Sequence, residues 1–467
     1  MTYEREGLLL PVPAEPAVDR ELFGSFEAAH SSFQEVYKQL ELTPVKKAAA
    51  HEAWANGQDA DLTAGTVDEQ ELLDRQAKLK AWKQELIVDE SVDPDVKQLY
   101  RWRVNEDIAN VNMLIASSRG DMRSFHRWNE FIYGKPDEDI YRGALDWVAH
   151  DADQLLISPN QHPAIIEAAS KVLSLIGDKR GYRELLAPEP ETFERVREDH
   201  LRVNGYYGLL LAGVEIPEGK IKKEVGDPIL KHIIKYNLQS DYGLADAPGA
   251  SWGVSHSKGV VERPVTYDMP AKRFVGLAIG HEIGSHELER VNGLRGPMEL
   301  ASVGFDRYEI TNEGRAVIRE AVQYETFDEF GKLVRFRDIL RRHIAISYAS
   351  GVGEDAPKAS SEVYALMQAI DIMYQTKLTP DDNEATAEKA RQKTTDLLDR
   401  VLKGTDGKGG AYLKDEVYLE GFVADWLVAA LKGPEAIFQG DLGKYGLNNL
   451  RHIIPLQKFG LLPDNEA

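Results

Sequence analysis

The sequence predicts an α+β fold that is predominantly helical and carries a small sheet. Apolar residues recur at helical spacing through most of the chain. The strand-like runs gather between residues 203 and 270 instead of alternating with helices, which favours an antiparallel or mixed sheet. With 467 residues and 43% hydrophobic side chains, the chain is long enough for one large or two ordinary domains with a sizeable core.

Three regions follow one another along the chain. Residues 1–20 contain three prolines and predict an extended arm, because proline fixes φ and removes a backbone donor. Residues 21–145 predict a helical N-terminal region, in which Leu72, Leu79 and Leu86 recur on one helix face. Residues 146–467 follow as the region that carries the chemistry described below.

The strand-like segments are residues 207–211 and 259–264, each bounded by Gly or Pro. The second could be an edge strand along which an extended peptide adds, or a strand with ordinary pairing on both sides. Long helical patterns follow at residues 271–292, 312–349, 358–377, 384–403 and 415–432. We expect Gly293 to end the first of these in a left-handed conformation.

Composition excludes several classes of function. The 77 acidic against 56 basic side chains give a formal charge of −21, which argues against nucleic acid as a partner. No cysteine is present, so any metal must be bound by His, Asp or Glu. No apolar run is long enough to span a membrane and the N-terminal residues lack a secretion signal, so we expect no membrane association and a cytoplasmic location.

The strongest local signal is His281-Glu282-x-x-x-His286 at the end of an apolar helical lead. The commoner metallopeptidase signature spaces its histidines by four, which places both on one helix face. Five residues of α-helix rotate by about 500°, leaving the imidazoles roughly 140° apart. A π-turn would bring them back together, and Gly284 eases that distortion. Without it, the two histidines would simply be unconnected side chains on a surface helix.

A catalytic zinc site needs three protein ligands and an open position. Glu313 is the leading candidate for the third ligand, at the start of a second helix that Thr311 could cap. A glutamate in the first turn of a helix could instead only complement the helix dipole. The loop at residues 294–310 leaves room for the second helix to pack beside the first.

These residues resemble the tyrosine carboxypeptidase family, which joins the microtubule-associated tyrosine carboxypeptidases to bacterial flavohaemoglobin expression-modulating proteins with a Gln-Glu-Gly-Leu-Ala motif. The similarity lies in residues 281–293 and 311–316, with further matches at residues 133–136, 400–404 and 413–421. Asn312 stands where the motif has Gln, and Arg315 where it has Leu. We expect these two departures to alter substrate preference and to leave ligand chemistry unchanged.

The resemblance implies a zincin-like metallopeptidase core that binds Zn²⁺ through His281, His286 and Glu313. It implies that Glu282 is the catalytic glutamate and assists the attack of water on a peptide carbonyl. It also implies a carboxypeptidase whose substrate is the C-terminus of a peptide or protein, with Tyr or another aromatic as a possible terminal residue.

A carboxypeptidase also needs a cation for the terminal carboxylate of its substrate. Arg290, Arg315, Arg342 and Lys414 are the candidates, and Lys414 lies in one of the family-like segments. Arg290 could equally support His286 from the same helix. Tyr418 could donate to the oxyanion, or it could be an ordinary core tyrosine.

Two alternatives stay open on the sequence. A dipeptidyl-peptidase type of enzyme has a related motif with its glycine one position later. A regulatory or scaffold protein would use the same residues for a structural metal, whose four positions protein ligands normally fill.

Overall fold

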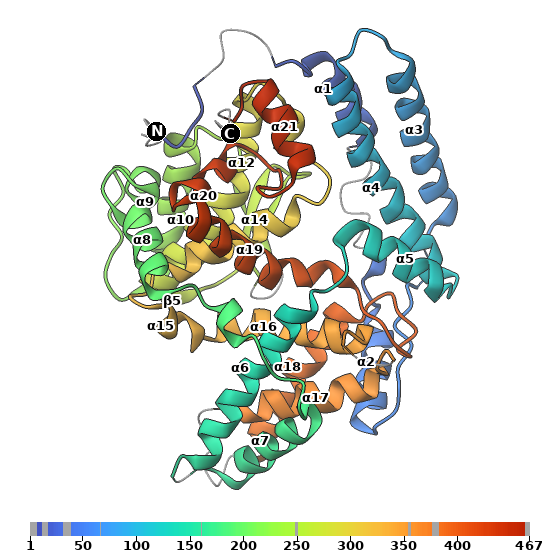
Figure 1. The fold of residues 1–467 in the computed structure, drawn as a ribbon, viewed down its shortest axis with the longest axis vertical. Coiled ribbons are helices and arrows are strands. Elements are labelled where there is room, and N and C mark those ends of the chain that lie inside the picture. Colours follow the sequence, from blue (N-terminus) through green and yellow to red (C-terminus); the bar gives the residue numbers. More distant parts are fainter. Residues whose placement is uncertain are drawn as a thin grey trace.

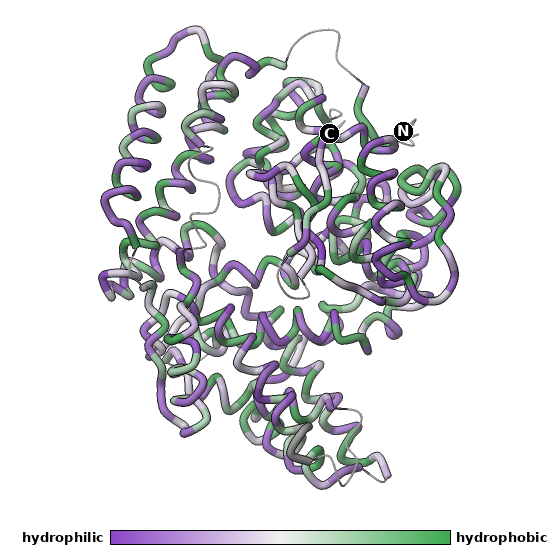
Figure 2. Tube along the Cα trace, turned by 180° about the vertical axis from the view of Figure 1, so that it is seen from behind, coloured by the Kyte–Doolittle hydropathy of each residue, from purple (hydrophilic) through white to green (hydrophobic). Residues whose placement is uncertain are grey.

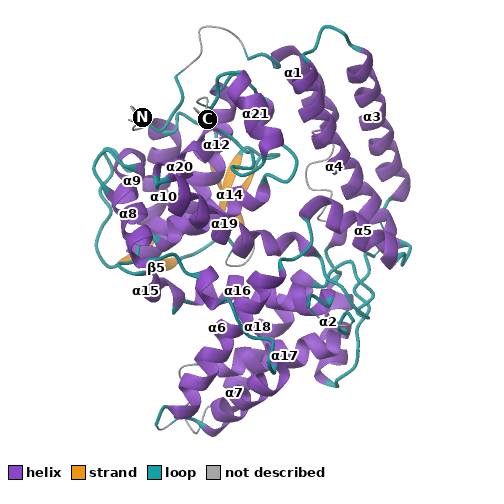
Figure 3. Cartoon of the chain, viewed as in Figure 1, coloured by secondary structure: helices purple, strands orange, loops and turns teal. Residues whose placement is uncertain are grey.

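The computed structural model describes residues 7–11, 17–30, 39–65, 67–159, 161–247, 251–353, 356–375 and 383–462. The chain is 66% helix and 4% strand, which confirms the predicted helical fold with a small sheet. Figure 3 shows the strands as small patches among many helices. None of the described helices is both long and apolar enough to cross a membrane.

The N-terminal helices form an arm beside the rest of the molecule (Figure 1). Its helices are α1 (Arg20–His30), α3 (Glu69–Val88), α4 (Pro94–Ser118) and α5 (Met122–Tyr133), whereas α2 (Pro44–Ala55) packs against α17 lower down. Leu72, Leu79 and Leu86 are buried, as their spacing predicts. Hydrophobic and hydrophilic stretches alternate along the paired helices α3 and α4 in Figure 2, as expected for helices with one covered face.

The lower part of the molecule consists of helices α6 (Glu138–Ile157), α7 (Pro163–Ile176), α16 (Val334–Ser350), α17 (Ser360–Met373) and α18 (Asn383–Val401). The expected division between residues 145 and 146 lies within α6. Leu145 and Trp147 on either side of it belong to the same hydrophobic core. A second hydrophobic core joins residues of the arm, such as Tyr100, to residues near the C-terminus, such as Leu456.

The strands form two small sheets. β1 (Lys220–Lys222) pairs antiparallel with β5 (Asp268–Pro270). β2 (Gly243–Ala247), β4 (Val260–Pro264) and β3 (Gly253–Ser255) form a mixed sheet in that order, parallel between β2 and β4 and antiparallel between β4 and β3. The segment at 259–264 is therefore a central strand, and its interpretation as an edge strand is wrong because both of its sides are paired. Within this sheet, β2 and β3 are the two edge strands.

The strand predicted at residues 207–211 is also wrong, because these residues form helix α9 (Tyr206–Leu210). Tyr206, Tyr207 and Leu210 are buried on one face of this turn. A short apolar run has no periodicity that separates a buried strand from a buried helix. Packing against the helix that carries the histidines decides the outcome here, as described below.

The predicted helix at residues 271–292 is continuous but changes type. It comprises α11 (Ala271–Arg273), the π-helix η5 (Phe274–Glu287) and α12 (Leu288–Arg295). The expected end at Gly293 is wrong, because α12 continues to Arg295. Gly293 is needed for another reason: a Cβ there would overlap the backbone of Ser302 in α13 (Leu300–Val303).

The predicted helix at 312–349 is divided into α14 (Glu309–Ala321), α15 (Phe327–Gly331) and α16. Helix α14 begins at Glu309, so Thr311 does not cap it, and the Thr311 hydroxyl instead accepts from the Leu447 backbone N–H at 3.3 Å. Helix α19 (Val417–Lys432) crosses α14 where a Cβ on Gly314 would overlap the backbone of Gly421. This close crossing fixes the position of α14 in the body.

Shorter elements complete the body around these helices. They are η3 (Arg183–Leu186), α8 (Pro190–Leu201), α10 (Lys223–His232), η4 (Ile233–Asn237), η6 (Leu413–Glu416), α20 (Glu435–Gln439), η7 (Gly440–Leu442) and α21 (Leu450–Lys458).

Candidate metal centre

His281, Glu282 and His286 lie on η5, which is a π-helix over fourteen residues. A π-helix bonds residue i to residue i+5, so histidines five apart return to nearly the same face. The centroids of the two imidazole rings lie 5.1 Å apart. The predicted π distortion is therefore confirmed, although it extends well beyond a single turn.

Glycines let η5 approach its neighbours closely. A Cβ on Gly280 would overlap the Tyr207 hydroxyl, and one on Gly284 would overlap the Tyr206 hydroxyl. Both tyrosines come from α9. The Tyr207 hydroxyl donates to the backbone carbonyl of Arg319 on α14 at 2.7 Å, so α9 ties the two metal-site helices together. Gly284 therefore allows close packing against α9, in addition to making the π distortion of the backbone easier.

Helix α14 delivers Glu313 to the two imidazoles. Glu313 Oε2 lies 3.4 Å from His281 Nε2 and 3.7 Å from His286 Nε2. One ligand atom from each of the three residues lies within 4.8 Å of the others. Two ligands held tetrahedrally at about 2.0–2.1 Å from one ion lie about 3.3 Å apart, so the two separations between Glu313 and the histidines are close to those of a zinc site.

Glu313 also provides a test of whether a cation fits between these side chains. Its Oε2 is buried and has no hydrogen-bond partner in the described part of the chain. A buried carboxylate oxygen without a partner carries a large desolvation penalty, which a bound cation relieves. The residues present therefore fit a divalent metal ion.

Further side chains orient the two imidazoles. His281 Nδ1 lies 2.8 Å from Glu320 Oε1, and because a carboxylate can only accept, Nδ1 is the donor, which leaves Nε2 as the nitrogen that faces Glu313. Arg335 Nε donates to the same Glu320 oxygen at 3.0 Å. Asn312 lies beside His286 and donates to the buried carboxylate of Glu289. The orientation of the His281 imidazole is thus fixed before any ion binds.

Burial and neighbouring charges shift the titration of these groups. Burial by itself would lower the pKa of His281, but the nearby carboxylates of Glu313 and Glu320 outweigh it and raise this pKa to about 10. Burial lowers the pKa of His286 to about 3, leaving a neutral imidazole. Burial raises the pKa of Glu282 to about 7, against the opposing effect of His281. A carboxylate with a pKa near neutrality is suited to general base catalysis.

The three side chains face a cleft of about 520 Å³. One wall comes from η5, α14 and the edge strand β3, with Trp252 and Tyr242 beside it. Residues of the arm, among them His30 and Asp107, also line the cleft. Glu282 lines the cleft next to His281, whose Nε2 lies 4.0 Å from Glu282 Oε1. A substrate entering this cleft would meet both the ligands and the carboxylate.

Two of the predicted carboxylate-binding cations line the cleft, but each already has an acidic partner. Lys414 Nζ lies 3.2 Å from Glu309 Oε1. Arg290 Nη2 lies 2.8 Å from Glu287 Oε1, and its guanidinium stacks 4.0 Å from the ring centroid of Tyr242. Arg290 therefore supports the cleft wall next to the helix that carries the histidines.

Arg342 and Tyr418 form one unit, of which only Tyr418 lines the cleft. Arg342 pairs with Asp338 at 2.6 Å and lies 5.2 Å from the centroid of the Tyr418 ring. Arg335, the partner of Glu320, lies 5.4 Å from the same centroid. Arg342 is therefore behind Tyr418 and supports it, and is not a wall of the cleft.

The departure at Arg315 has a structural explanation. Arg315 is fully buried outside the cleft and donates to Glu289 Oε1 at 2.6 Å. A Cβ on Gly440 would overlap the Arg315 guanidinium, so the chain leaves room for it. Asn312, by contrast, lines the cleft. Of the two departures, only Asn312 is placed to contact a substrate.

Sequence reasoning missed Glu320, Lys444 and His256, the last two of which line the cleft. Glu320 follows Glu313 by seven residues, so both lie on one face of α14, and this spacing was an available signal. Lys444 lies in the loop after η7 and His256 in the turn after β3, and neither belongs to a motif.

Comparisons with known proteins add no relative. No protein-family model matches the chain, and neither a curated protein nor a solved structure shows significant similarity to it.

Proposed function

We propose that the chain is a zinc-dependent metallopeptidase that acts as a carboxypeptidase. One observation carries the proposal: a π-helix and α14 gather His281, His286 and Glu313 around one point, next to the buried Glu282 and open to a cleft. The proposal includes membership of the tyrosine carboxypeptidase family and a zincin-like core, on the strength of the motif residues.

The donor set supports zinc in a catalytic role. Two imidazole nitrogens and one carboxylate oxygen are zinc ligands, and three protein ligands leave a position for water or substrate. In the described residues, the cluster contains no fourth His, Asp or Glu ligand. This favours a catalytic over a structural metal.

When bound, zinc supplies a Lewis acid that polarises a peptide carbonyl and favours deprotonation of water. Glu282 takes the proton of the attacking water and returns it to the leaving amine. Tyr418, whose hydroxyl makes no hydrogen bond within the described residues, donates to the oxygen on which negative charge develops. Burial raises the pKa of Tyr418, so its hydroxyl keeps its proton at neutral pH.

The cleft supports an aromatic residue at the end of the substrate. Tyr242, Trp252 and Tyr308 all line it. Aromatic rings contribute large contact areas and prefer other rings in offset or edge-on geometry. One side of the edge strand β3 pairs with no strand among the described residues, and an extended peptide could add there.

The test is metal analysis combined with mass-spectrometric profiling of a peptide mixture. The purified protein is expected to hold about one zinc per chain and to release single residues from free C-termini. Glu282→Gln should retain the zinc and lose cleavage, while Glu325→Gln, a change at an exposed position, should retain both. Cleavage that persists in Glu282→Gln would refute the mechanism.

Peptides that are blocked at one end distinguish a carboxypeptidase from a dipeptidyl-peptidase type of enzyme. A carboxypeptidase loses activity on C-terminal amides and keeps it on N-acetylated peptides. A dipeptidyl-peptidase type would show the reverse pattern and would replace the present proposal.

A further inference from the structure

Lys444 is a buried cation in the wall of the cleft. Its side chain is part of the cleft lining, although the residue is only 1% exposed. Its backbone N–H donates to the Ala301 carbonyl at 2.7 Å, and its carbonyl accepts from the Phe305 N–H at 3.0 Å. These two bonds anchor the loop after η7 beside α13 and hold Lys444 in place.

Lys444 differs from the other cations of the cleft in its partners. Arg103, Arg290 and Lys414 each form an ion pair with a carboxylate. Within the described ranges, Lys444 has no carboxylate at ion-pair distance, and its side-chain partner is His256 Nε2 at 2.6 Å. The acidic groups whose charges raise the pKa of Lys444, Glu289 and Glu287, form ion pairs with Arg315 and Arg290.

The bond to His256 fixes the charge state of the pair. An ammonium has no acceptor, so His256 Nε2 must accept and the ring proton must lie on Nδ1. Nδ1 lies 3.1 Å from the Tyr242 hydroxyl, which can donate onward to the His256 carbonyl at 3.4 Å. The chain of hydrogen bonds therefore joins a neutral imidazole to a charged ammonium. Two of the three ammonium protons remain for other acceptors.

A buried ammonium whose side-chain hydrogen-bond partner, among the described residues, is a neutral imidazole is a costly arrangement for a folded protein. In the wall of a cleft, this cost is offset when the ligand supplies the anion. Burial lowers the pKa of Lys444 to about 8, so the ammonium stays charged at neutral pH. The centroid of the Tyr308 ring lies 5.8 Å from Lys444 Nζ. Tyr308 is the residue directly before α14, the helix that carries Glu313.

We propose that Lys444, held by His256, binds the terminal α-carboxylate of the peptide substrate. This inference rests on the proposed function and deepens it, because it assigns the cation that makes the enzyme specific for free C-termini. None of the four cations expected from the sequence takes this role. Tyr242 and Tyr308 flank the bound carboxylate and leave an aromatic environment for the terminal side chain.

Binding of matched peptides tests the proposal without turnover. The zinc-loaded Glu282→Gln protein is titrated by calorimetry with N-acetyl-Ala-Ala-Tyr and with the corresponding C-terminal amide. We expect the acid to bind at least about 10-fold more tightly than the amide. Adding Lys444→Met should bring this ratio close to one by weakening the acid alone, and Lys444→Arg should restore part of it.

Control variants separate Lys444 from other lysines. Lys458→Met removes a surface cation paired with Asp93 and should leave the acid-to-amide ratio unchanged. Lys414→Met tests the competing candidate and should also leave the ratio unchanged. A ratio that survives Lys444→Met, or that disappears in Lys414→Met, overturns the proposal.

A stability measurement guards against misfolding of the variant. Lys444→Met replaces an uncompensated buried charge by an apolar side chain of similar length, so its thermal midpoint should equal or exceed that of the parent. Should the variant unfold early, His256→Gln provides a second route, since loss of the imidazole should reduce the acid-to-amide ratio severalfold. An unchanged ratio in that variant contradicts the role of His256.

Failure of the two proposals can be told apart. If no peptide is cleaved but the acid preference exists and depends on Lys444, the proposed activity fails and the carboxylate site stands. If free C-termini are cleaved and the preference does not depend on Lys444, only the carboxylate site fails.

Discussion

Two glutamates on one face of α14 act on the same imidazole from opposite sides. Glu313 reaches the Nε2 side of His281, and Glu320 binds Nδ1. The first would ligate the metal, and the second keeps the ring in the tautomer that can ligate it. Arg335 in turn keeps Glu320 ionised, because its guanidinium counters the effect of burial and lowers the pKa of that carboxyl.

Glu320→Ala should weaken zinc binding by about 10-fold to 100-fold, because His281 loses the partner that fixes its tautomer and raises its basicity. Competition with a chromogenic chelator measures the affinity. The matched change Glu325→Ala, at an exposed position on the following turn, should leave it unchanged. Equal affinities in both variants would contradict the orienting role.

The residues of the metal centre were predicted from their local sequence pattern. His281, Glu282, His286 and Glu313 lie within 33 positions of one another, and their chemistry and spacing are visible in the sequence. Lys444 and His256 are separated by 188 positions and meet only through the fold. No periodicity or motif connects these two residues, so Lys444 could not be selected from the sequence as the cation that binds the substrate carboxylate.

The π-helix is held by packing against another element. Gly280 and Gly284 provide space for two tyrosine hydroxyls from α9, and an ordinary side chain at either position would push the helices apart. The Tyr206 hydroxyl also donates to the Gly280 carbonyl at 3.4 Å. Such a contact suits a helix whose own hydrogen-bond pattern is altered.

Gly284→Ala should destabilise the fold by about 1–3 kcal/mol through overpacking, and should lower zinc affinity as η5 shifts. Urea unfolding and chelator competition measure the two effects. Adding Tyr206→Phe removes the overlapping oxygen and should recover part of the stability. A double variant as unstable as the sum of the two single changes would show that this contact is not the cause.

The need for a π distortion followed from the sequence, because histidines five apart diverge on an α-helix. Its length did not, since it depends on the contact with α9, a segment that the sequence predicts as a strand. The helix at 312–349 shows the same limit: its apolar pattern continues through residues 322–333, where the chain turns twice before α16. Tertiary contacts decide such boundaries.

Across the whole molecule, a buried network of charges joins α14, α19 and η7. Arg315 pairs with Glu289, and Arg319 donates to Asp441. Asp425 on α19 lies in the same region, and its carboxylate oxygens have no hydrogen-bond partner among the described residues. Burial raises the pKa of Asp425 to about 8, although Arg315 opposes this shift.

This raised pKa predicts how stability depends on pH. Between about pH 4 and 8 the folded protein keeps the Asp425 proton while the unfolded chain has lost it, so the free energy of unfolding falls as pH rises. The slope from this group is at most about 1.4 kcal/mol per pH unit. Asp425→Asn cannot ionise, so urea unfolding at pH 5, 6 and 7 should show a smaller decline. An identical slope in both proteins would contradict the assignment.

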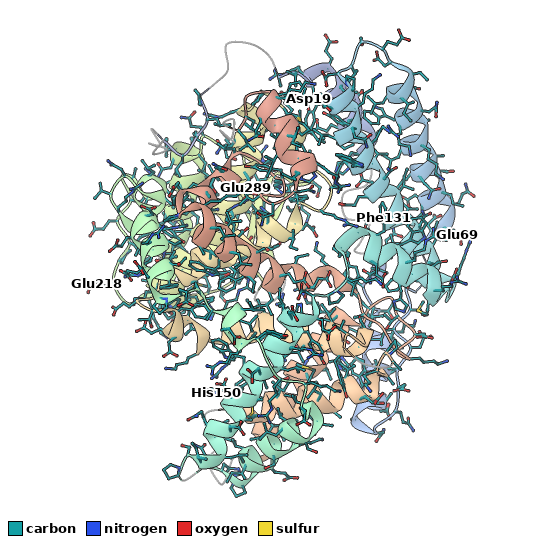
Figure 4. The ribbon with its side chains drawn as sticks, viewed as in Figure 1. Asp19, Glu69, Phe131, His150, Glu218 and Glu289 are labelled. Carbon is teal, nitrogen blue, oxygen red and sulfur yellow. The ribbon has the colours of Figure 1, made fainter. Side chains whose placement is uncertain are left out.

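In addition to the hydrophobic core that the arm shares with the body, polar contacts join the two. Asp19 accepts the backbone N–H groups of Glu299 and Leu300 at 2.7 and 3.0 Å and the Tyr100 hydroxyl at 2.7 Å. Arg307 donates to the Phe131 carbonyl at 2.7 Å. Asp19 and Phe131 are labelled in Figure 4, where both lie on the arm side, whereas Glu289 lies within the body.

Asp19→Ala should lower the free energy of unfolding by about 3 kcal/mol, because three donors lose a buried acceptor. Chemical denaturation measures the loss, and Asp89→Ala, at an exposed position, should change stability by less than about 1 kcal/mol. If the two variants are equally stable, Asp19 does not join the arm to the body. The helical class of the arm was predictable, but these links across 280 positions were not.

The central claim is that His281, His286 and Glu313 hold one zinc ion. Anomalous diffraction at the zinc edge, from crystals of the zinc-loaded protein, tests it most directly. The account predicts a single strong peak about 2.0–2.2 Å from Nε2 of each histidine and from a Glu313 carboxylate oxygen. A peak bound to other residues, or no peak between these three, would contradict it.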